Sequence, residues 1–219
     1  MAAPNERRRK LLKEVVGRRQ TNWTVVLENV HDRHNLAAVM RSCDAVGIQE
    51  IFLLQTDPKL RAKNIKLGKK TSGGVRKWLD VHYYQDVDAC FRHVRQIADQ
   101  VYATHLGEEA VGLHDLDFRG SVALLFGNEH DGLSQETLAQ ADQNFIIPMY
   151  GIVQSLNISV ACAVSLFEGL RQRQAEGAYD NPPTTAEERQ ALFDTYMHRH
   201  EHGQPEKLKL LDGPRGVRP

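Results

Sequence analysis

The sequence predicts an α/β protein in which a mainly parallel sheet is covered by helices on both faces. Short apolar runs typical of buried strands alternate with segments whose apolar residues recur at helical spacing. Strands separated by helices of this length favour parallel pairing, because a parallel connection needs a long crossover. With 219 residues, 41% of them hydrophobic, the chain can bury a substantial core as one domain with terminal extensions.

Each expected element has a local signal. The run WTVVLE indicates a buried strand at residues 23–28, and Gly47 marks the end of an apolar helical pattern. The segment NPP at residues 181–183 breaks the chain before a last helix. The expected helices are 4–19, 35–46, 86–99, a short one after Ser134, 156–174 and 185–200. The expected strands are 23–28, 50–54, 78–83, 100–104, 122–126 and 144–147.

Several classes of protein and site are excluded or disfavoured. No apolar run reaches transmembrane length and the basic N-terminus lacks an apolar signal core, so we expect a cytoplasmic protein without a membrane partner. Cys43, Cys90 and Cys162 lie far apart without a C-x-x-C spacing, which indicates neither a disulfide framework nor a metal site. The motifs GxGxxG, GxxxxGK[ST] and GxSxG do not occur.

The net charge is zero, but the charges are segregated along the chain. Residues 59–77 contain no acid, whereas acids recur between Glu108 and Asp142. Two interpretations stay open at this point: a solvated surface, or a surface for a phosphate-rich partner such as a nucleic acid. The N-terminal cations are Arg7, Arg8, Arg9, Lys10, Lys13, Arg18 and Arg19. Those of the second segment are Lys59, Arg61, Lys63, Lys66, Lys69, Lys70, Arg76 and Lys77.

Three separated polar clusters each lie where an apolar run gives way to a turn or a helix: NLAAVMR at 35–41, GNEHDG at 127–132 and IPMYGIVQSLNIS at 147–159. Because the last two follow parallel strands, they can meet at one crevice beyond the carboxyl ends. Each residue also has a structural interpretation, such as a helix N-cap for Asn35 or a turn glycine for Gly127. Several such coincidences are less probable than one shared site.

NVHDRHNLAAVMRSCDAVGI, LLFGNEHDGLS and IPMYGIVQSLNISVACAVSLFE, in this order, resemble the three motifs of the SpoU class of SPOUT RNA 2′-O-ribose methyltransferases. The resemblance implies a SPOUT fold with a deep C-terminal trefoil knot, a homodimer, and S-adenosylmethionine as cofactor. It implies a catalytic domain at 21–175, flanked by a basic RNA-binding helix at 1–20 and a helical tail at 176–219. These extensions are similar to those of members that methylate guanosine 18 in the D-loop of tRNA.

The resemblance also implies roles for individual residues. It implies tRNA as the partner, without a DNA partner or a bound metal. Ribosomal RNA as substrate, or a catalytically silent RNA-binding protein, are the alternatives. Free arginine is a poor base because its pKa lies above about 12, so we expect Arg41 to orient a phosphate and the ribose hydroxyl. The expected catalytic residues are Arg41, Asn35, Glu129, Ser155 and Asn157, and the expected cofactor-binding residues are Thr104, Gly127, Ile147 and Leu156.

Overall fold

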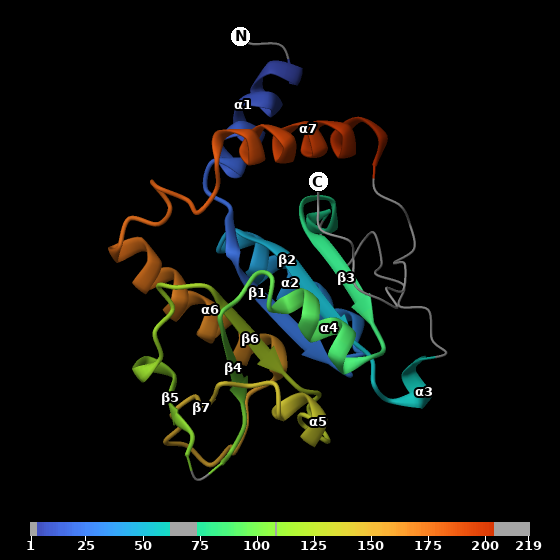
Figure 1. Cartoon of the computed structure of the whole chain (residues 1–219), viewed down its shortest axis with the longest axis vertical. Helices are drawn as coiled ribbons and strands as arrows, with labels where there is room; N and C mark the ends of the chain where they lie inside the picture. Colours follow the sequence, from blue (N-terminus) through green and yellow to red (C-terminus); the bar gives the residue numbers. More distant parts are fainter. Residues whose placement is uncertain (1–3, 62–73, 108, 204–219) are drawn as a thin grey trace.

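The computed structural model describes residues 4–61, 74–107 and 109–203. Its centre is a seven-stranded sheet in the order β3-β2-β1-β6-β4-β7-β5, in which all neighbouring strands run parallel (Figure 1). This confirms the predicted sheet. The strands are β1 (Gln20–Glu28), β2 (Ile48–Leu54), β3 (Asp80–Tyr84), β4 (Gln100–Thr104), β5 (Val111–Gly112), β6 (Val122–Phe126) and β7 (Gln143–Ile146).

Helices cover both faces of the sheet, as predicted. Val25 and Leu27 of β1 point to the face on which α2 and α6 pack, whereas Val26 points to the face under α4 and α5. A strand buried on both faces needs apolar residues at every position, which explains the run in β1. The helices are α1 (Pro4–Val16), α2 (Arg33–Ala45), α3 (Pro58–Arg61), α4 (Val87–Val94), α5 (Gln135–Leu138), α6 (Ile158–Ala175) and α7 (Ala186–His202).

The predicted boundaries hold best for strands in the middle of the sheet. β4 and β6 have the predicted bounds, whereas α4 is shorter than the expected helix 86–99. The two-residue β5 was missed, and two short 3-10 helices, η1 (Val75–Trp78) and η2 (Leu113–Asp115), were not expected. Most of the basic segment 59–77 lies outside the described residues. The trefoil knot stays a prediction.

The two terminal extensions pack against each other rather than projecting separately. Leu12 and Val16 of α1 form a small apolar core with Tyr196 and Met197 of α7. Figure 1 shows the two helices together at one end of the molecule. α7 begins with a capping box: the Thr185 hydroxyl accepts from the amide of Glu188, and the Glu188 carboxylate accepts from the amide of Thr185. Among the described residues, no helix combines the length and apolarity needed to cross a membrane.

The helix α6 lies close to β1 because a glycine faces the sheet. A Cβ at Gly169 would lie 2.5 Å from Cζ2 of Trp23 and 3.0 Å from the Phe118 ring. One turn further along α6, the guanidinium of Arg173 lies 4.7 Å from the centre of the Trp23 ring. The packing of α6 on the start of β1 therefore requires glycine at position 169 and is stabilised by the contact of the Arg173 guanidinium with the Trp23 ring.

The Arg173 guanidinium is buried without a described carboxylate partner. It donates to the carbonyl oxygen of Gly120 and to the side-chain oxygens of Gln20, at 3.0 Å, and Asn22, at 2.8 Å. Burial lowers the pKa of Arg173 to about 10. Neutral oxygens thus hold this cation, and they join α6 to the amino end of β1.

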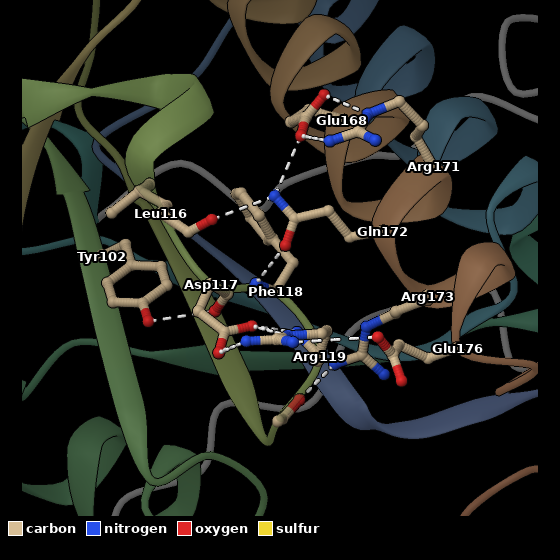
Figure 2. A network of polar contacts seen from close by, with 11 residues as sticks. Tyr102, Leu116, Asp117, Phe118, Arg119, Glu168, Arg171, Gln172, Arg173 and Glu176 are labelled. Atoms are coloured by element: carbon tan, nitrogen blue, oxygen red, sulfur yellow. Dashed lines mark hydrogen bonds and ion pairs between the residues drawn. The ribbon is translucent and has the colours of Figure 1, made fainter.

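A second set of polar contacts joins α6 to the segment after η2 (Figure 2). The Gln172 amide group donates to the carbonyl of Leu116 at 2.9 Å and accepts from the amide of Phe118 at 3.0 Å. Arg171 donates to both oxygens of Glu168, at 2.7 and 3.0 Å. The Arg171 guanidinium holds the pKa of Glu168 at about 2, below its ordinary value of 4.5.

Arg19 is a second buried arginine, and it corrects the grouping of basic residues made from the sequence. Its side chain is 1% exposed and donates to the carbonyl of Ile48 at 2.8 Å, to Asp44 at 2.6 Å and to the carbonyl of Trp78 at 3.2 Å. Arg7, Arg8 and Arg9, by contrast, are exposed on α1. Arg19 therefore holds the core together and cannot belong to an RNA-facing surface.

Candidate active site

Three segments meet beyond the carboxyl ends of the central strands. The segments that follow β4, β6 and β7, the last of which runs directly to α6, line a cavity of about 610 Å³. This volume is typical of ligand pockets, which measure about 300–1,000 Å³. Its location is the edge at which parallel sheets bind ligands. The structure places all four predicted cofactor-binding residues in its wall: Thr104, Gly127, Ile147 and Leu156.

Gly127 begins a tight turn whose backbone leaves no room for a side chain. A Cβ at Gly127 would lie 2.1 Å from the carbonyl carbon of Gly132. The Asn128 side chain accepts from the amides of His130 and Asp131, both at 2.8 Å, and Gly132 has a left-handed φ of 66°. We call residues 127–132 the 127–132 turn. The turn itself requires glycine at its start, as the structural interpretation proposed, and that glycine also lines the cavity.

The cavity walls are largely apolar. Phe145, Ile147 and Leu156 line it together with the half-exposed Met149. The hydroxyl of Thr104 donates to the carbonyl of Leu125 at 3.2 Å, so its proton is used within the sheet. Apolar surface combined with polar groups is typical of a site for an aromatic or heterocyclic ligand, whose orientation those polar groups can fix.

Three predicted catalytic residues form one hydrogen-bonded cluster at the mouth of the cavity. The Asn35 amide group donates to Oε1 of Glu129, and Asn157 Nδ2 donates to Oδ1 of Asn35 at 3.1 Å. Glu129 and Asn157 also line the cavity. The structure therefore brings together residues from all three sequence clusters, which lie as many as 122 positions apart.

The N-cap interpretation of Asn35 is wrong. Asp32 is the N-cap of α2, where its carboxylate accepts from the amides of His34, at 2.6 Å, and Asn35, at 3.2 Å. These backbone hydrogen bonds lower the pKa of Asp32. Asn157 does cap α6, because its oxygen accepts from the Ser159 amide at 2.9 Å. The Asn35 side chain is thus available to the site, whereas Asn157 serves the helix and the site together.

The other two predicted catalytic residues lie outside this hydrogen-bonded cluster. Ser155 is exposed and lines the cavity. Arg41 is exposed on α2, and no hydrogen bond or ion pair joins its side chain to any residue that the structure describes. Six residues separate it from Asn35, which places it about 120° around the helix. Within one chain, Arg41 therefore points away from the face that carries Asn35.

Sequence reasoning missed Glu28, the last residue of β1, whose side chain is fully buried. Its carboxylate accepts hydrogen bonds from Ser134 and Thr137, which follow the 127–132 turn. The available signal was an acid that ends the apolar run WTVVLE. A carboxylate at the end of a buried strand needs several donors, and it therefore indicates a polar junction.

One group of side chains in the described part of the chain could hold a metal ion, and it lies away from the cavity. Glu50, His82 and His93 are buried under α4, where His82 Nε2 lies 2.7 Å and His93 Nε2 lies 3.8 Å from Oε2 of Glu50. None of the three lines the cavity. These contacts explain the group as a hydrogen-bonded pair of Glu50 and His82, with the imidazole of His93 beside it.

A larger and strongly basic groove lies between α1 and α7. It measures about 1030 Å³, and Arg9 lies 5.5 Å from the centre of the Phe193 ring within it. Its position, away from the carboxyl ends of the strands, does not suit a cofactor of a parallel sheet. We call it the α1–α7 groove. Its charged lining residues are Glu6, Arg7, Arg9, Lys10, Lys13 and Arg189.

The sequence profile of the SpoU rRNA Methylase family matches residues 22–167, which include all three polar clusters. The chain belongs to this family. The tRNA (guanosine(18)-2′-O)-methyltransferase of Thermus thermophilus is 42% identical over 199 residues, which cover 91% of this chain and all of the relative. The enzyme of the same name from Escherichia coli is 37% identical over 83% of this chain and 78% of its own. This family membership confirms the resemblance found in the motifs.

Solved structures agree with the family assignment. The TrmH/SpoU tRNA modifying enzyme of A. aeolicus superposes with a TM-score of 0.80 at 33% identity, over 89% of this chain and 97% of that one. The AdoMet-bound rRNA methyltransferase of Sinorhizobium meliloti gives a TM-score of 0.59 at 30% identity, over 73% of this chain and 59% of that one. The likeness is greater to the tRNA enzyme, both in TM-score and in the share of each chain covered.

Proposed function

We propose that the chain transfers a methyl group from S-adenosylmethionine to the ribose 2′-hydroxyl of guanosine 18 in tRNA. The observation that carries this proposal is the Asn35–Glu129–Asn157 cluster at the mouth of an apolar cavity on the carboxyl edge of the sheet. Relatives named for this reaction cover most of the chain, whereas the 23S rRNA relative of Xanthomonas campestris covers 68% of it. These two facts favour tRNA over ribosomal RNA.

The cavity fits the cofactor in size and in chemistry. When bound, S-adenosylmethionine supplies an electrophilic methyl group on a sulfonium. Ile147 and Leu156 offer apolar surface to an adenine ring, and the 127–132 turn brings backbone groups close because Gly127 has no side chain. Thr104, Gly127, Ile147 and Leu156 are therefore proposed as cofactor-binding residues, with no metal required.

The polar cluster is suited to hold a ribose for in-line attack. Asn35 and Asn157 offer amide donors and acceptors, and Glu129 offers a carboxylate at the same mouth. Ser155 adds an exposed hydroxyl beside them. Placing the 2′-hydroxyl in line with the methyl group can account for a large part of the rate, since well-oriented reactants gain effective molarities of about 10⁵ M or more.

Arg41 is proposed to orient the phosphate beside the target ribose. A guanidinium offers paired donors that match two phosphate oxygens, and it stays charged at any physiological pH. Its exposure and its lack of a partner among the described residues leave those donors available. The direction in which it points within one chain is best explained if it serves the cavity of a second chain.

We propose a homodimer with composite sites. Val160, Val164 and Phe167 form an exposed apolar stripe on α6, with exposed fractions of 47%, 40% and 52%. Their spacing of four and three residues places them on one helix face, and such a face is typical of a surface that packs against a partner. A second copy on this stripe would lie beside α2, which packs on α6 and carries Arg41.

Complementation tests this assembly. Mixing Arg41→Ala protomers with Asn157→Ala protomers should restore part of the activity if the two residues serve one site from different chains. The restored share is at most about one wild-type site per mixed dimer. A monomeric mass in light scattering at micromolar concentration would contradict the dimer, whereas a dimer without complementation would confine each site to one chain.

The α1–α7 groove is proposed as a binding surface for the tRNA backbone. Its cations outnumber its acids by five to one, and Arg7, Arg9 and Lys10 come from the part of α1 that is exposed. Such a surface binds phosphates without regard to base sequence. A cytoplasmic location, where tRNA is found, is part of this proposal.

The deciding experiment maps 2′-O-methyl groups in RNA incubated with the protein and S-adenosylmethionine. We expect one new methylated nucleotide, guanosine 18, in tRNA transcripts, and no product when that guanosine is replaced by adenosine. Arg41→Ala protein provides the enzyme-side control. Modification of 23S rRNA in preference to tRNA would establish the alternative substrate, and binding of tRNA without methylation would establish a silent RNA-binding protein.

A further inference from the structure

The buried carboxylate of Glu28 lies at a junction of three loops around the candidate active site. It ends β1, one residue beyond the last pair of the β1–β6 ladder, Leu27 with Phe126. The residue that follows β6 is Gly127, the start of the 127–132 turn. Glu28 therefore lies beside the point at which the second polar cluster leaves the sheet.

Four donors from two different loops converge on this carboxylate. Oε1 accepts from the hydroxyls of Thr56 at 2.9 Å, Ser134 at 2.7 Å and Thr137 at 2.8 Å. Oε2 accepts from the backbone amide of Ser134 at 2.8 Å. A fully buried carboxylate is costly unless it is saturated with donors, so these contacts fix the loops on both sides of β1.

The neighbouring Asn29 connects the junction to the segment that leads to α2. Its backbone is in the left-handed region at a φ of 54°, its Nδ2 donates to Thr56 at 2.8 Å, and its Oδ1 accepts from the Asp57 amide at 3.0 Å. The chain then runs to Asp32, the N-cap of α2. Glu28 and Asn29 thus set where the helix that carries Asn35 begins relative to the loop after β2.

The position of Glu28 affects the cavity because hydrogen bonds tie the 127–132 turn together. Asn128 accepts from two amides of the turn, and the amide of Gly132 donates to the Asn128 carbonyl at 3.1 Å. Two residues later the chain reaches Ser134, which Glu28 holds twice. A movement of Ser134 therefore moves the whole turn, and with it Glu129, which contacts Asn35.

We propose that Glu28 is a positioning residue for methyl transfer, which acts by holding Glu129 in register with Asn35. The inference rests on the proposed function for its kinetic part. Glu28 is fully buried and does not line the cavity, so its role does not require contact with S-adenosylmethionine or the ribose. Its effect on the reaction passes through Ser134 and the 127–132 turn.

Glu28→Gln is the most direct test, because it keeps the shape and removes one acceptor. The Ser134 amide can only donate, so the glutamine must turn its carbonyl to that amide. Its NH₂ group then faces three hydroxyls, and it can donate to at most two of them. The junction persists but loses its fixed geometry. We expect kcat to fall about 10-fold or more, since a misplacement of about 1 Å can cost about 100-fold, while KM for tRNA changes less than about twofold.

Glu50→Gln is the matched control. Glu50 is also a buried carboxylate at the sheet, on the adjacent strand β2, but its contacts are to His82 and His93 under α4. Both variants should lower the melting temperature. Only Glu28→Gln should lower kcat, measured well below both melting temperatures. Equal kcat values in the two variants would show that Glu28 only stabilises the fold.

Hydrogen exchange supplies a readout that does not depend on activity. In Glu28→Gln the amides of residues 130–134 should exchange faster than in wild type, and in Glu50→Gln they should not. If wild-type protein methylates no tRNA, the proposed function fails while this measurement still tests the junction. If Glu28→Gln does not fold, Ser134→Ala takes its place: a kcat and exchange pattern equal to wild type would overturn the proposal, and a lower kcat with faster exchange would support it.

Discussion

The two ends of β1 use buried charged groups for opposite purposes. At its amino end, Arg19 and Arg173 are enclosed by backbone and side-chain oxygens that join α2, α6 and the core. At its carboxyl end, Glu28 is enclosed by donors from loops that carry exposed residues such as Glu129. The first end stabilises the fold, and the second positions a site. The residue type therefore does not reveal the role, which depends on whether the contacts of the buried group end in the core or continue to the surface.

Arginine shows the same contrast on a smaller scale. Arg173 has its donors occupied by Gln20, Asn22 and Gly120, whereas Arg41 has no partner among the described residues. A buried guanidinium whose hydrogen bonds are satisfied contributes to stability, and a free exposed one contributes almost nothing to it. Substituting each should therefore separate activity from stability.

Arg41→Ala should have the largest effect on activity. Removing a preorganised electrostatic group that binds the substrate typically costs roughly 100-fold or more in kcat, and we expect a reduction of about that size. The melting temperature and the affinity for S-adenosylmethionine should change little, because the exposed side chain forms no hydrogen bond or ion pair with a described residue. Arg41→Lys keeps the charge without the paired donors and should retain intermediate activity. Near-normal turnover of the alanine variant with saturating tRNA would remove Arg41 from the mechanism.

Arg173→Met should show the reverse pattern. The substitution keeps the length but leaves the oxygens of Gln20, Asn22 and Gly120 without their donor, at a cost of roughly 2–3 kcal/mol in the free energy of unfolding. For a chain of this size the melting temperature should fall by about 4–12 °C, while kcat at low temperature stays near wild type. Arg92→Met, at an exposed position on α4, is the control and should leave the melting temperature unchanged.

Neutralising Arg7, Arg8 and Arg9 together should weaken tRNA binding without harming the catalytic centre. For every phosphate that the variant no longer binds, the slope of log affinity against log salt should fall by about 1. Fluorescence titrations between about 50 and 200 mM salt measure that slope. Arg92→Ala removes one exposed cation on α4 and should leave it unchanged. An equal slope in the triple variant would mean that this end of α1 is solvated surface.

The smallest effect concerns acid stability. Arg171 holds the pKa of Glu168 at about 2 in the folded chain, below its ordinary value of 4.5. Because the folded pKa is the lower one, this contact stabilises the fold fully above pH about 4.5, and the stabilisation disappears as the pH falls toward 2. Glu168→Gln should therefore differ from wild type in melting temperature at about pH 6 and converge with it near about pH 2.5. Glu201→Gln, at an exposed carboxylate of α7, should have the same dependence of melting temperature on pH as wild type.

The sequence predicted most of the sheet because its strands are buried on both faces. β4 and β6 are short apolar runs with clear ends, and their bounds were predicted as found. The two-residue β5 carries no periodicity that could reveal it. The prediction for Arg19 failed because charge runs along the chain say nothing of side-chain direction where α1 gives way to β1.

The sequence could predict which residues belong to the candidate site, but not which of them form hydrogen bonds with one another. The motifs placed Asn35, Glu129 and Asn157 at the ends of elements, and the structure joins them. The Asn35 N-cap interpretation failed because Asp32, three residues earlier, takes the cap. Glu28 could not be given a role from the sequence, because its donors Ser134 and Thr137 are more than 100 positions away.

The pairing of β1 with both β2 and β6 has a consequence for how the chain folds. One edge of β1 can be filled as soon as β2 is made, but its other edge waits for β6, roughly 100 residues later. At ribosomal rates of about 5–20 residues per second, that edge stays open for about 5–20 s. An apolar strand with an unfilled edge is a template for intermolecular pairing. This chain therefore most needs protection from aggregation after its amino-terminal half has been made and before β6 is complete.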